Sequence, residues 1–252
     1  MKDERELFRK RLIELAERSD RSMVPCFTPF MGLMEQNIFR CTEKEFSHVQ
    51  YTLFGGTEGC ERVMARFGDE ANCSYMPPFP IVCLKGTPLS AKFADDLTHR
   101  DILGAVMNLG IDRNTTGDIV IRDNCFYLFC TEGVAPHIEE NLIRAKHTDL
   151  RIERVDKPPQ GELYRLERQQ INSASERVDG ITAQFLKAGR SEVASIIEQR
   201  RLFINGRVCE NGGKTLKSGD VVSVRGSGRF IFRETVKTTK KGRLMIEIDR
   251  FC

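Results

Sequence analysis

The carboxyl-terminal third of the chain is rich in arginine and lysine, the side chains that bind phosphate most strongly. Residues 177–252 contain 16 basic and 8 acidic residues, a net charge of +8, whereas the rest of the chain has 23 basic and 28 acidic residues, a net charge of −5. A guanidinium group suits phosphate because its fork of N–H donors matches two oxygens at once. A strongly basic segment joined to a mildly acidic body indicates a protein that binds a polyanion.

The basic segment supplies the donors that folded RNA requires. Side chains cannot enter the deep major groove of an RNA helix, so proteins contact its phosphates and the 2′-hydroxyls of its shallow groove. Hydroxyl, amide and backbone N–H donors add neutral contacts at close approach. We expect the basic side chains to share one face of the fold. The predicted RNA-binding residues are Arg190, Ser191, Arg200, Arg201, Asn205, Arg207, Lys214, Lys217, Arg225, Gly226, Gly228, Arg229, Lys240, Lys241 and Arg243.

Two patterns that could support catalysis are incomplete. His99-Arg100-Asp101 has the order of a kinase catalytic loop, but the chain has neither a glycine-rich phosphate loop nor an Asp-Phe-Gly sequence. The triplet is interpreted either as a helix cap with a buried ion pair or, through His99 and Arg100, as an RNA-facing group. Asp179 lies in a segment similar to the nucleophile segment of pseudouridine synthases, yet it is predicted to be a helix residue. We therefore expect no enzyme; the alternative, an RNA-modifying enzyme, would use Asp101 or Asp118.

Neither the cysteines nor the histidines have the spacing of metal ligands. The nine cysteines include no Cys-x-x-Cys pair, and the four histidines are scattered. No metal, cofactor or small-molecule substrate is expected, and the cysteines are predicted to be reduced, as in a cytoplasmic protein. No apolar run approaches the roughly 18–20 residues of a membrane span, so no membrane partner is expected.

The amino-terminal region is predicted to be a mixed α/β subdomain. Residues 4–18 carry apolar side chains at helical spacing. Thr28-Pro29 could start a second helix that ends near Cys41, because threonine caps helices and proline suits the first helical position. Residues 46–54 are predicted to form a strand, and residues 58–67 a short helix after Gly55-Gly56.

The middle region has the order strand, helix, strand, strand, helix, strand. Thr98 is predicted to cap the first helix, with Asp101 at its third position and Gly110 at its end. The predicted strands cover residues 81–85, 118–121, 125–130 and 150–155, and the second helix covers residues 135–145. This order is typical of a ferredoxin-like βαββαβ unit.

The carboxyl-terminal region is predicted to be a separate domain. Two short helices precede a hairpin whose turn is Asn205-Gly206, and strands follow at residues 221–225 and 243–249. The overall prediction is an α+β protein. Its parts are an amino-terminal α/β subdomain (1–76), a ferredoxin-like subdomain (77–156), a linker (157–176) and an RNA-binding domain (177–252).

This carboxyl-terminal domain resembles the S-four, or alpha-L, RNA-binding domain. The resemblance rests on Arg177-Val-Asp179, Gly189-Arg190-Ser191, residues 202–206 and residues 219–226, which agree in order and spacing over about seventy residues. The family usually has serine where this chain has Gly189. The resemblance implies that the basic face of the domain binds structured RNA.

The upstream region resembles the bacterial YlmH family, whose members join such a region to an alpha-L domain. The resembling segments are residues 54–62 and residues 97–119, and the resemblance extends over most of the chain. It implies a factor that binds rRNA, and possibly tRNA, on the large ribosomal subunit during rescue of stalled ribosomes. A second surface for RNA or a partner is predicted at Gly55, Gly56, Arg62, His99, Arg100 and Arg113. A cell-division adaptor, with RNA binding incidental, is the remaining alternative.

Overall fold

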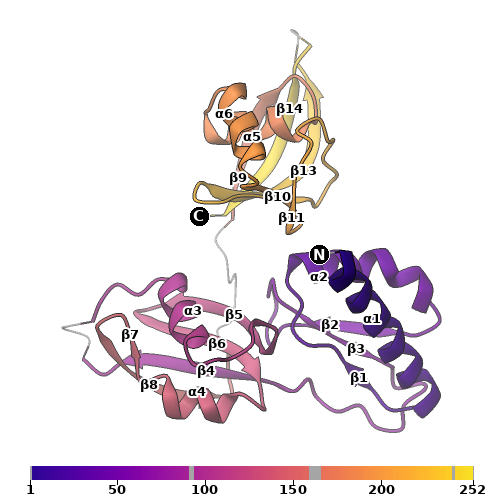
Figure 1. Ribbon diagram of the computed structural model, residues 1–252, viewed down its shortest axis with the longest axis vertical. Helices are drawn as coiled ribbons and strands as arrows, with labels where there is room; N and C mark the ends of the chain where they lie inside the picture. Colours follow the sequence, from indigo (N-terminus) through magenta and orange to yellow (C-terminus); the bar gives the residue numbers. More distant parts are fainter. Residues whose placement is uncertain (1, 91–93, 159–165, 240–241, 252) are drawn as a thin grey trace. The chain divides into compact units, whose positions relative to one another are not determined.

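The computed structural model describes residues 2–90, 94–158, 166–239 and 242–251 (Figure 1). The chain has a mixed α/β fold that divides into two compact units, Met1–Leu163 and Tyr164–Cys252. Within the described ranges, no helix combines the length and the apolar character needed to cross a lipid bilayer. Each unit is built around its own sheets.

The first unit begins with two helices on a small sheet. Its elements are α1 (Lys2–Ser22), β1 (Cys26–Phe27), α2 (Leu33–Thr42), a 3-10 turn (Glu43–Phe46), β2 (Tyr51–Phe54) and β3 (Met64–Phe67), and the strands pair antiparallel in the order β1-β3-β2. Leu12 and Leu15 of α1 are buried with Phe39, Phe46 and Phe67. The apolar stripe of α1 therefore covers this sheet, as the helical spacing predicted.

Three predictions for this region need correction. Helix α2 begins at Leu33, because the hydroxyl of Thr28 accepts a hydrogen bond from the Ala65 N–H at 2.8 Å and holds that residue beside β3. The predicted strand is shorter, since β2 begins only at Tyr51. The predicted helix over residues 58–67 is wrong, because Met64–Phe67 is the central strand of the sheet.

The second part of this unit is a five-stranded antiparallel sheet with two helices. Its elements are β4 (Ile81–Pro88), α3 (His99–Met107), a 3-10 turn (Arg113–Thr115), β5 (Thr116–Arg122), β6 (Cys125–Thr131), α4 (Ala135–Asn141), β7 (Arg144–Ala145) and β8 (Thr148–Val155). The strand order is β5-β6-β4-β8-β7. Strands β4 and β5, which α3 connects, are separated by β6, and this is the arrangement of a split βαβ unit.

Local signals predicted these elements well. Thr98 and Asp101 form the expected capping box of α3. Asp123 and Asn124, both with positive φ, make the tight turn between β5 and β6. Helix α4 ends at Asn141, earlier than predicted, because β7 begins three residues later.

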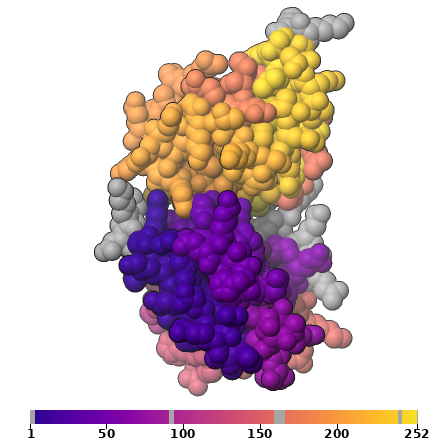
Figure 2. Space-filling view, turned by 90° about the vertical axis from the view of Figure 1, so that its right-hand side faces the viewer, coloured from indigo at the N-terminus to yellow at the C-terminus, as the bar shows by residue number. Residues whose placement is uncertain are grey.

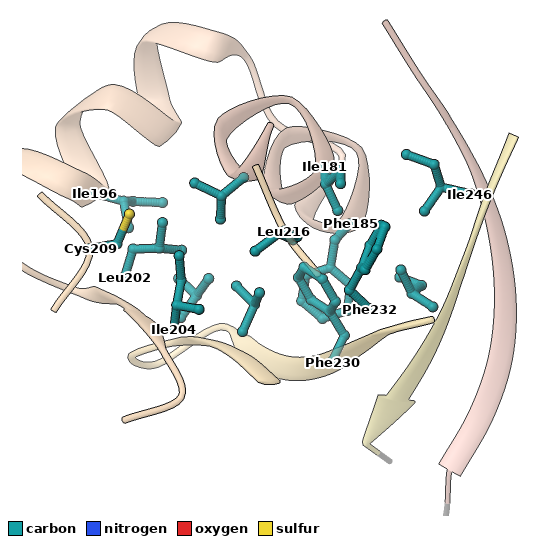
Figure 3. Close-up of a cluster of buried hydrophobic side chains, with 14 residues drawn as sticks. Ile181, Phe185, Ile196, Leu202, Ile204, Cys209, Leu216, Phe230, Phe232 and Ile246 are labelled. Carbon is teal, nitrogen blue, oxygen red and sulfur yellow. The ribbon is translucent and has the colours of Figure 1, made fainter. Parts of the chain in front are cut away.

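The second unit packs two helices against a six-stranded sheet. Its elements are β9 (Leu166–Ser173), α5 (Val178–Leu186), α6 (Arg190–Glu198), β10 (Leu202–Ile204), β11 (Arg207–Val208), β12 (Val221–Val224), β13 (Gly228–Thr238) and β14 (Leu244–Phe251). The strand order is β11-β10-β12-β13-β14-β9, with all neighbours antiparallel. Figure 3 shows the core between the layers, where Ile181 and Phe185 of α5 meet Phe230 and Phe232 of β13.

The sequence analysis missed two strands of this sheet. Strand β13 spans eleven residues that were given no element, and β9 lies in the segment that was assigned to a linker. Strand β9 pairs with β14 along its whole length, from Leu166 opposite Phe251 to Ser173 opposite Leu244. Residues 166–173 therefore belong to the second unit. Figure 2 shows the outside of this unit, where its middle residues (orange) adjoin its last residues (yellow).

Candidate nucleic-acid interface

The loop between α5 and α6 exposes positive charge at the start of a helix. Lys187 ends α5 in the left-handed conformation, with φ +54°, and Gly189 caps α6 without a side-chain hydrogen bond. Arg190 and Ser191 are the first two residues of α6, and both are exposed. A helix start favours an anion, because its N–H groups and its dipole point toward the ligand.

The turn between β12 and β13 lies against the end of α5. A Cβ atom on Gly228 would lie 3.4 Å from the Phe185 ring, so the turn and the helix end are in contact. The Arg225 N–H donates to the Arg201 carbonyl oxygen, and the Arg201 guanidinium donates to the Arg225 carbonyl oxygen, each at 2.9 Å. The Arg225 side chain is exposed. Arg201 thus positions the turn that presents Arg225, a role the sequence did not predict.

Gly226 and Gly228 allow this turn to form. Their φ angles are +84° and +124°, values at which other residues are strained. The two glycines therefore shape the turn, whether or not their N–H groups contact RNA.

Asn205 has a structural role at the β10–β11 turn. Its amide nitrogen donates to Asp220 at 2.7 Å, and its amide oxygen accepts from the Val221 N–H at 2.9 Å. Asn205 and Gly206 have φ angles of +49° and +73°, so the predicted Asn-Gly turn is confirmed. Because both polar atoms of the Asn205 amide are bonded within the unit, we no longer count this side chain as a primary RNA contact.

Three further predicted residues lie near this turn. Arg207 is opposite Ile204 in the β10–β11 pair, and its Nε atom is buried without a hydrogen-bond partner. Lys214 and Lys217 are exposed in the connection from β11 to β12. These side chains give the turn region its positive charge.

Several arginines of the second unit are already neutralised by carboxylates. Arg200 pairs with Glu210 at 2.6 Å, although both side chains are largely exposed. Arg168 and Arg233 both bind Asp249, at 3.0 and 2.6 Å, and Asp249 is only 4% exposed. Burial acts to raise the pKa of Asp249, but its bonds to Arg168 and Arg233 outweigh burial and lower that pKa. These pairs leave less positive charge for RNA than the composition suggests.

Two arginines at the end of the sheet are held over aromatic rings. The Arg229 guanidinium carbon lies 3.7 Å from the centre of the Phe251 ring, and that of Arg250 lies 5.4 Å from the centre of the Phe185 ring. Arg250 was not predicted as a site residue. It is opposite Phe230 in the β13–β14 pair, a relationship between distant residues that no local pattern reveals.

Arg243 lies far from Arg229 along the β13–β14 hairpin. Strand β13 has eleven residues, and a strand rises about 3.3 Å per residue, so its ends are roughly 30 Å apart. Arg229 lies at the first end of β13, and Arg243 follows the hairpin turn at the other end. Lys240 and Lys241, predicted with Arg243, lie outside the described residues. The described cations therefore form at least two groups.

Four of the six residues predicted as a second surface are engaged inside the first unit. The Arg62 guanidinium donates to the carbonyl oxygens of Thr116, Arg113 and Phe30 at 2.9, 3.0 and 3.3 Å. Arg113 donates to the Thr116 and Gly117 carbonyl oxygens at 2.8 and 3.0 Å. Arg62 thus joins β5 and the turn before it to the first sheet, and Arg113 braces the start of β5.

Gly55 and Gly56 are needed for close packing at the same junction. A Cβ atom on Gly56 would lie 2.3 Å from the Phe129 ring, and one on Gly55 would lie 2.4 Å from the Arg62 carbonyl oxygen. Gly56 also has a φ angle of +110°. Both glycines therefore have a structural role at this junction.

The remaining two residues, His99 and Arg100, are exposed at the start of α3. Beside them, Asp101 accepts hydrogen bonds from Lys146 at 2.8 Å and from the Thr98 hydroxyl at 2.6 Å. These bonds lower the pKa of Asp101 to about 2. The predicted cap is confirmed, whereas the ion pair is formed with Lys146 and is partly exposed rather than buried.

The aspartates considered for catalysis all have structural roles. Asp118 is 3% exposed and accepts hydrogen bonds from the N–H groups of Glu61 and Arg62. Asp179 is the second residue of α5, as predicted, and pairs with Arg177 at 2.6 Å. Among the described residues, no cluster of histidine, cysteine and carboxylate side chains could hold a metal ion.

Residues 82–158, from β4 to just beyond β8, match a family model described as "Putative RNA-binding domain in YlmH". This segment is similar to that domain and is called the YlmH-type domain below. It consists of the five-stranded sheet with α3 and α4, the region that the sequence analysis assigned to a ferredoxin-like subdomain.

Two individual proteins are similar to this chain. The Bacillus subtilis (strain 168) protein named "Ribosome-associated protein quality control protein P2" is 24% identical over 165 residues. That alignment spans 64% of this chain and 64% of the Bacillus protein, less than two thirds of its length. A solved structure, "Cell division protein ylmH from Streptococcus pneumoniae", is 20% identical with a TM-score of 0.48, and the match covers 60% of this chain and 91% of that one.

The YlmH-type domain does not have the charge of a general RNA-binding surface. Residues 82–158 contain 10 basic and 12 acidic residues, a net charge of −2. Four of the basic side chains are in ion pairs: Arg144 with Asp149, Lys146 with Asp101, Arg151 with Glu153 and Arg154 with Glu139. This domain is therefore less basic than residues 177–252, whose net charge is +8.

Proposed function

We propose that this protein is a non-catalytic RNA-binding factor that acts on the ribosome in the cytoplasm. Its partners are structured rRNA of the large subunit and peptidyl-tRNA, and its role is the rescue of stalled ribosomes. The name of the Bacillus relative and the description of the family model both support a ribosome-associated, RNA-binding role. Neither of them names an enzyme.

The observation that carries the proposal is the group of exposed cations around the end of α5. Arg190 at the start of α6 and Arg225 on the β12–β13 turn are both exposed. Gly228 of that turn lies against Phe185, five residues before Arg190, and Arg201 holds Arg225. Arg190 and Arg225 can approach phosphates without first breaking an ion pair of the kind that holds Arg168 and Arg233. This makes them the strongest candidates for phosphate contacts.

The salt dependence of binding tests the proposal. Affinity for isolated large ribosomal subunits, measured by co-sedimentation over a range of KCl concentrations, should fall steeply with salt because bound phosphates release counterions. Arg190→Gln with Arg225→Gln should reduce the log–log slope by about 1.4–1.8, at roughly 0.7–0.9 per phosphate contact. The charge-matched control, Arg11→Gln with Arg168→Gln, changes two paired arginines and should leave the slope unaltered. Equal slopes for both double variants would refute the assignment.

A further inference from the structure

The YlmH-type domain contains a pocket that combines an apolar floor with carboxylate side chains. The pocket has a volume of about 410 Å³ and lies between the end of β4, the segment before α3 and the β5–β6 turn. Its apolar lining residues are Pro88, Leu97, Ile121 and Phe126. Its carboxylates are those of Asp95, Asp96 and Asp123.

The apolar side chains share one face of the sheet. Ile121 and Phe126 are opposite each other in the β5–β6 pair, and Phe126 belongs to the hydrophobic cluster that α3 and α4 cover, against which Leu97 also packs. Pro88 lies two residues after Gly86, the β4 partner of Phe126, so Pro88 is on the same face. Phe126 is 1% exposed, whereas Ile121 is 39% exposed. The floor therefore extends from the core to the surface on a single side of the sheet.

The three carboxylates come from two separate segments. Asp96 and Asp123 are exposed. Asp95 is held in place, because its Oδ2 atom accepts hydrogen bonds from the His147 N–H at 2.9 Å and from the Thr148 hydroxyl at 3.2 Å. The bond from His147, and after it the bond from Thr148, lowers the pKa of Asp95. The pocket is therefore negatively charged at neutral pH.

The ion pairs of this domain leave the pocket carboxylates available. Within the described ranges these pairs use other carboxylates, those of Asp101, Glu139, Asp149 and Glu153. Lys146 is the partner of Asp101, at 2.8 Å. That bond, followed by nearby charges that include Asp95 and Asp96, raises the pKa of Lys146. Because Lys146 is already bound, a cation from another molecule can pair with the pocket.

We infer that this pocket receives a lysine side chain of a basic protein on the large ribosomal subunit. A lysine has an unbranched apolar stem and a charged head, so it can lie along the floor and place its ammonium group among the carboxylates. The three N–H donors of an ammonium group have no fixed plane, which suits carboxylates from separate segments better than the planar fork of arginine does. Phosphates would be repelled here, and the net charge of −2 of the domain has the same effect.

The inference rests on the proposed function in taking the ribosome as the partner, and Asp96→Asn with Asp123→Asn tests it in the full-length protein. Both side chains are exposed, and asparagine accepts the positive φ angle of Asp123, so the double variant should fold. Co-sedimentation compares its affinity for intact large subunits with its affinity for protein-free rRNA extracted from them. Binding to intact subunits should weaken by at least about 10-fold, near the lower end of what close charge pairs contribute across interfaces. Binding to the extracted rRNA should not weaken.

Further measurements separate the pocket from general effects of charge. Glu132→Gln with Glu140→Gln removes two exposed carboxylates of the same domain outside the pocket lining, and should leave both affinities unchanged. Ile121→Thr keeps a β-branched residue in β5 but shortens the apolar floor, so it should weaken binding to intact subunits alone. Carbodiimide, which joins a carboxylate to an amine in contact with it, should link Asp96 or Asp123 to a lysine of a ribosomal protein that mass spectrometry identifies. Thermal unfolding of every variant identifies any that fails to fold.

The outcomes distinguish this inference from the proposed function. The pocket does not receive a lysine if the double variant at Asp96 and Asp123 binds intact subunits as tightly as the unaltered protein. The same conclusion follows if its affinities for subunits and for extracted rRNA fall or rise together, because the carboxylates would then act on RNA. The double variant at Arg190 and Arg225 should instead weaken binding to subunits and to extracted rRNA alike. If the unaltered protein binds neither, the proposed function is contradicted, and with it the partner named here.

Discussion

Replacing Arg62 tests whether the junction inside the first unit depends on this side chain. Its guanidinium donates two well-formed hydrogen bonds, at 2.9 and 3.0 Å, and one long bond, at 3.3 Å, to backbone carbonyl oxygens of β5, the preceding turn and Phe30. Arg62→Met keeps most of the aliphatic stem but removes all three donors. The carbonyl oxygens then lose partners that bridged two sheets.

The expected cost follows from the strength of these bonds. A hydrogen bond that involves a charged group contributes roughly 1.5–3 kcal/mol. Because one of the three is long and water can replace part of the loss at a half-buried side chain, we expect Arg62→Met to lower the free energy of unfolding by about 3–5 kcal/mol. For a unit of about 160 residues, this corresponds to a decrease in Tm of roughly 6–20 °C.

The assay is thermal and denaturant unfolding followed by circular dichroism, with Arg11→Met as a charge-matched control. Arg11 lies on α1 with its side chain 57% exposed, so its replacement should barely change Tm. RNA affinity measured well below Tm should be the same for both variants. The reasoning fails if Arg62→Met is as stable as Arg11→Met, or if it remains folded and yet loses RNA affinity, because Arg62 would then be a contact residue.

Three further changes probe other parts of the fold. Gly56→Ala should destabilise the first unit by more than about 2 kcal/mol, because its Cβ atom would overlap the Phe129 ring at a strained φ angle. Gly59→Ala should cost only about 1 kcal/mol, because Gly59 has a positive φ angle but its Cβ atom would meet no atom within 4 Å. Differential scanning fluorimetry compares the two variants, and equal Tm values would contradict the packing argument. Asp101→Asn should flatten the acid side of the stability curve. The bonds from Lys146 and Thr98 lower the pKa of Asp101 in the folded protein to about 2 from an ordinary value of 3.8. The stabilisation that these bonds give is therefore present above pH 4 and lost as the pH falls toward 2. Denaturation midpoints between pH 2 and 6 measure this loss, and an unchanged pH dependence in the variant would count against the bonds. Asn205→Ala should destabilise the second unit by about 2–4 kcal/mol, because it loses two hydrogen bonds and puts an alanine in the strained left-handed conformation. Asn205→Gly also loses the hydrogen bonds but avoids the backbone strain, so it should be the more stable of the two. Urea unfolding that shows no difference between the two variants would rule out the strain contribution.

The elements that the sequence predicted correctly are those specified by neighbouring residues. The capping box of Thr98 and Asp101 and the Asn205-Gly206 turn each depend on fewer than five consecutive positions. The failures involve pairing between distant residues. Met64–Phe67 belongs to a sequence that could form a helix, but it pairs with β1 on one side and β2 on the other, and tertiary pairing overrides such weak propensities. Strand β9 was missed because its residues are mostly polar, as an edge strand allows.

The candidate site shows the same division. Composition identified the second unit as the basic part of the chain. Arg225 was predicted at the end of a strand, but β12 ends at Val224 and Arg225 lies on the turn that follows. The partners of the other arginines could not be predicted. Arg168 meets Asp249 across 81 positions of the sequence, and Arg62 meets Thr116 across 54. Whether a cation is available to RNA is therefore decided by contacts that only the folded chain reveals.

The pairing of β9 with β14 affects how the second unit can be prepared as a separate fragment. A recombinant fragment that begins at Arg177 would lack β9 and leave the eight-residue strand β14 as an open edge, including Ile246 and Ile248 of the core. Open, apolar strand edges pair with other chains and cause aggregation. A fragment that starts ahead of Leu166 keeps this edge covered, so the solubility of such truncations is set by a strand that precedes the helices carrying the basic surface.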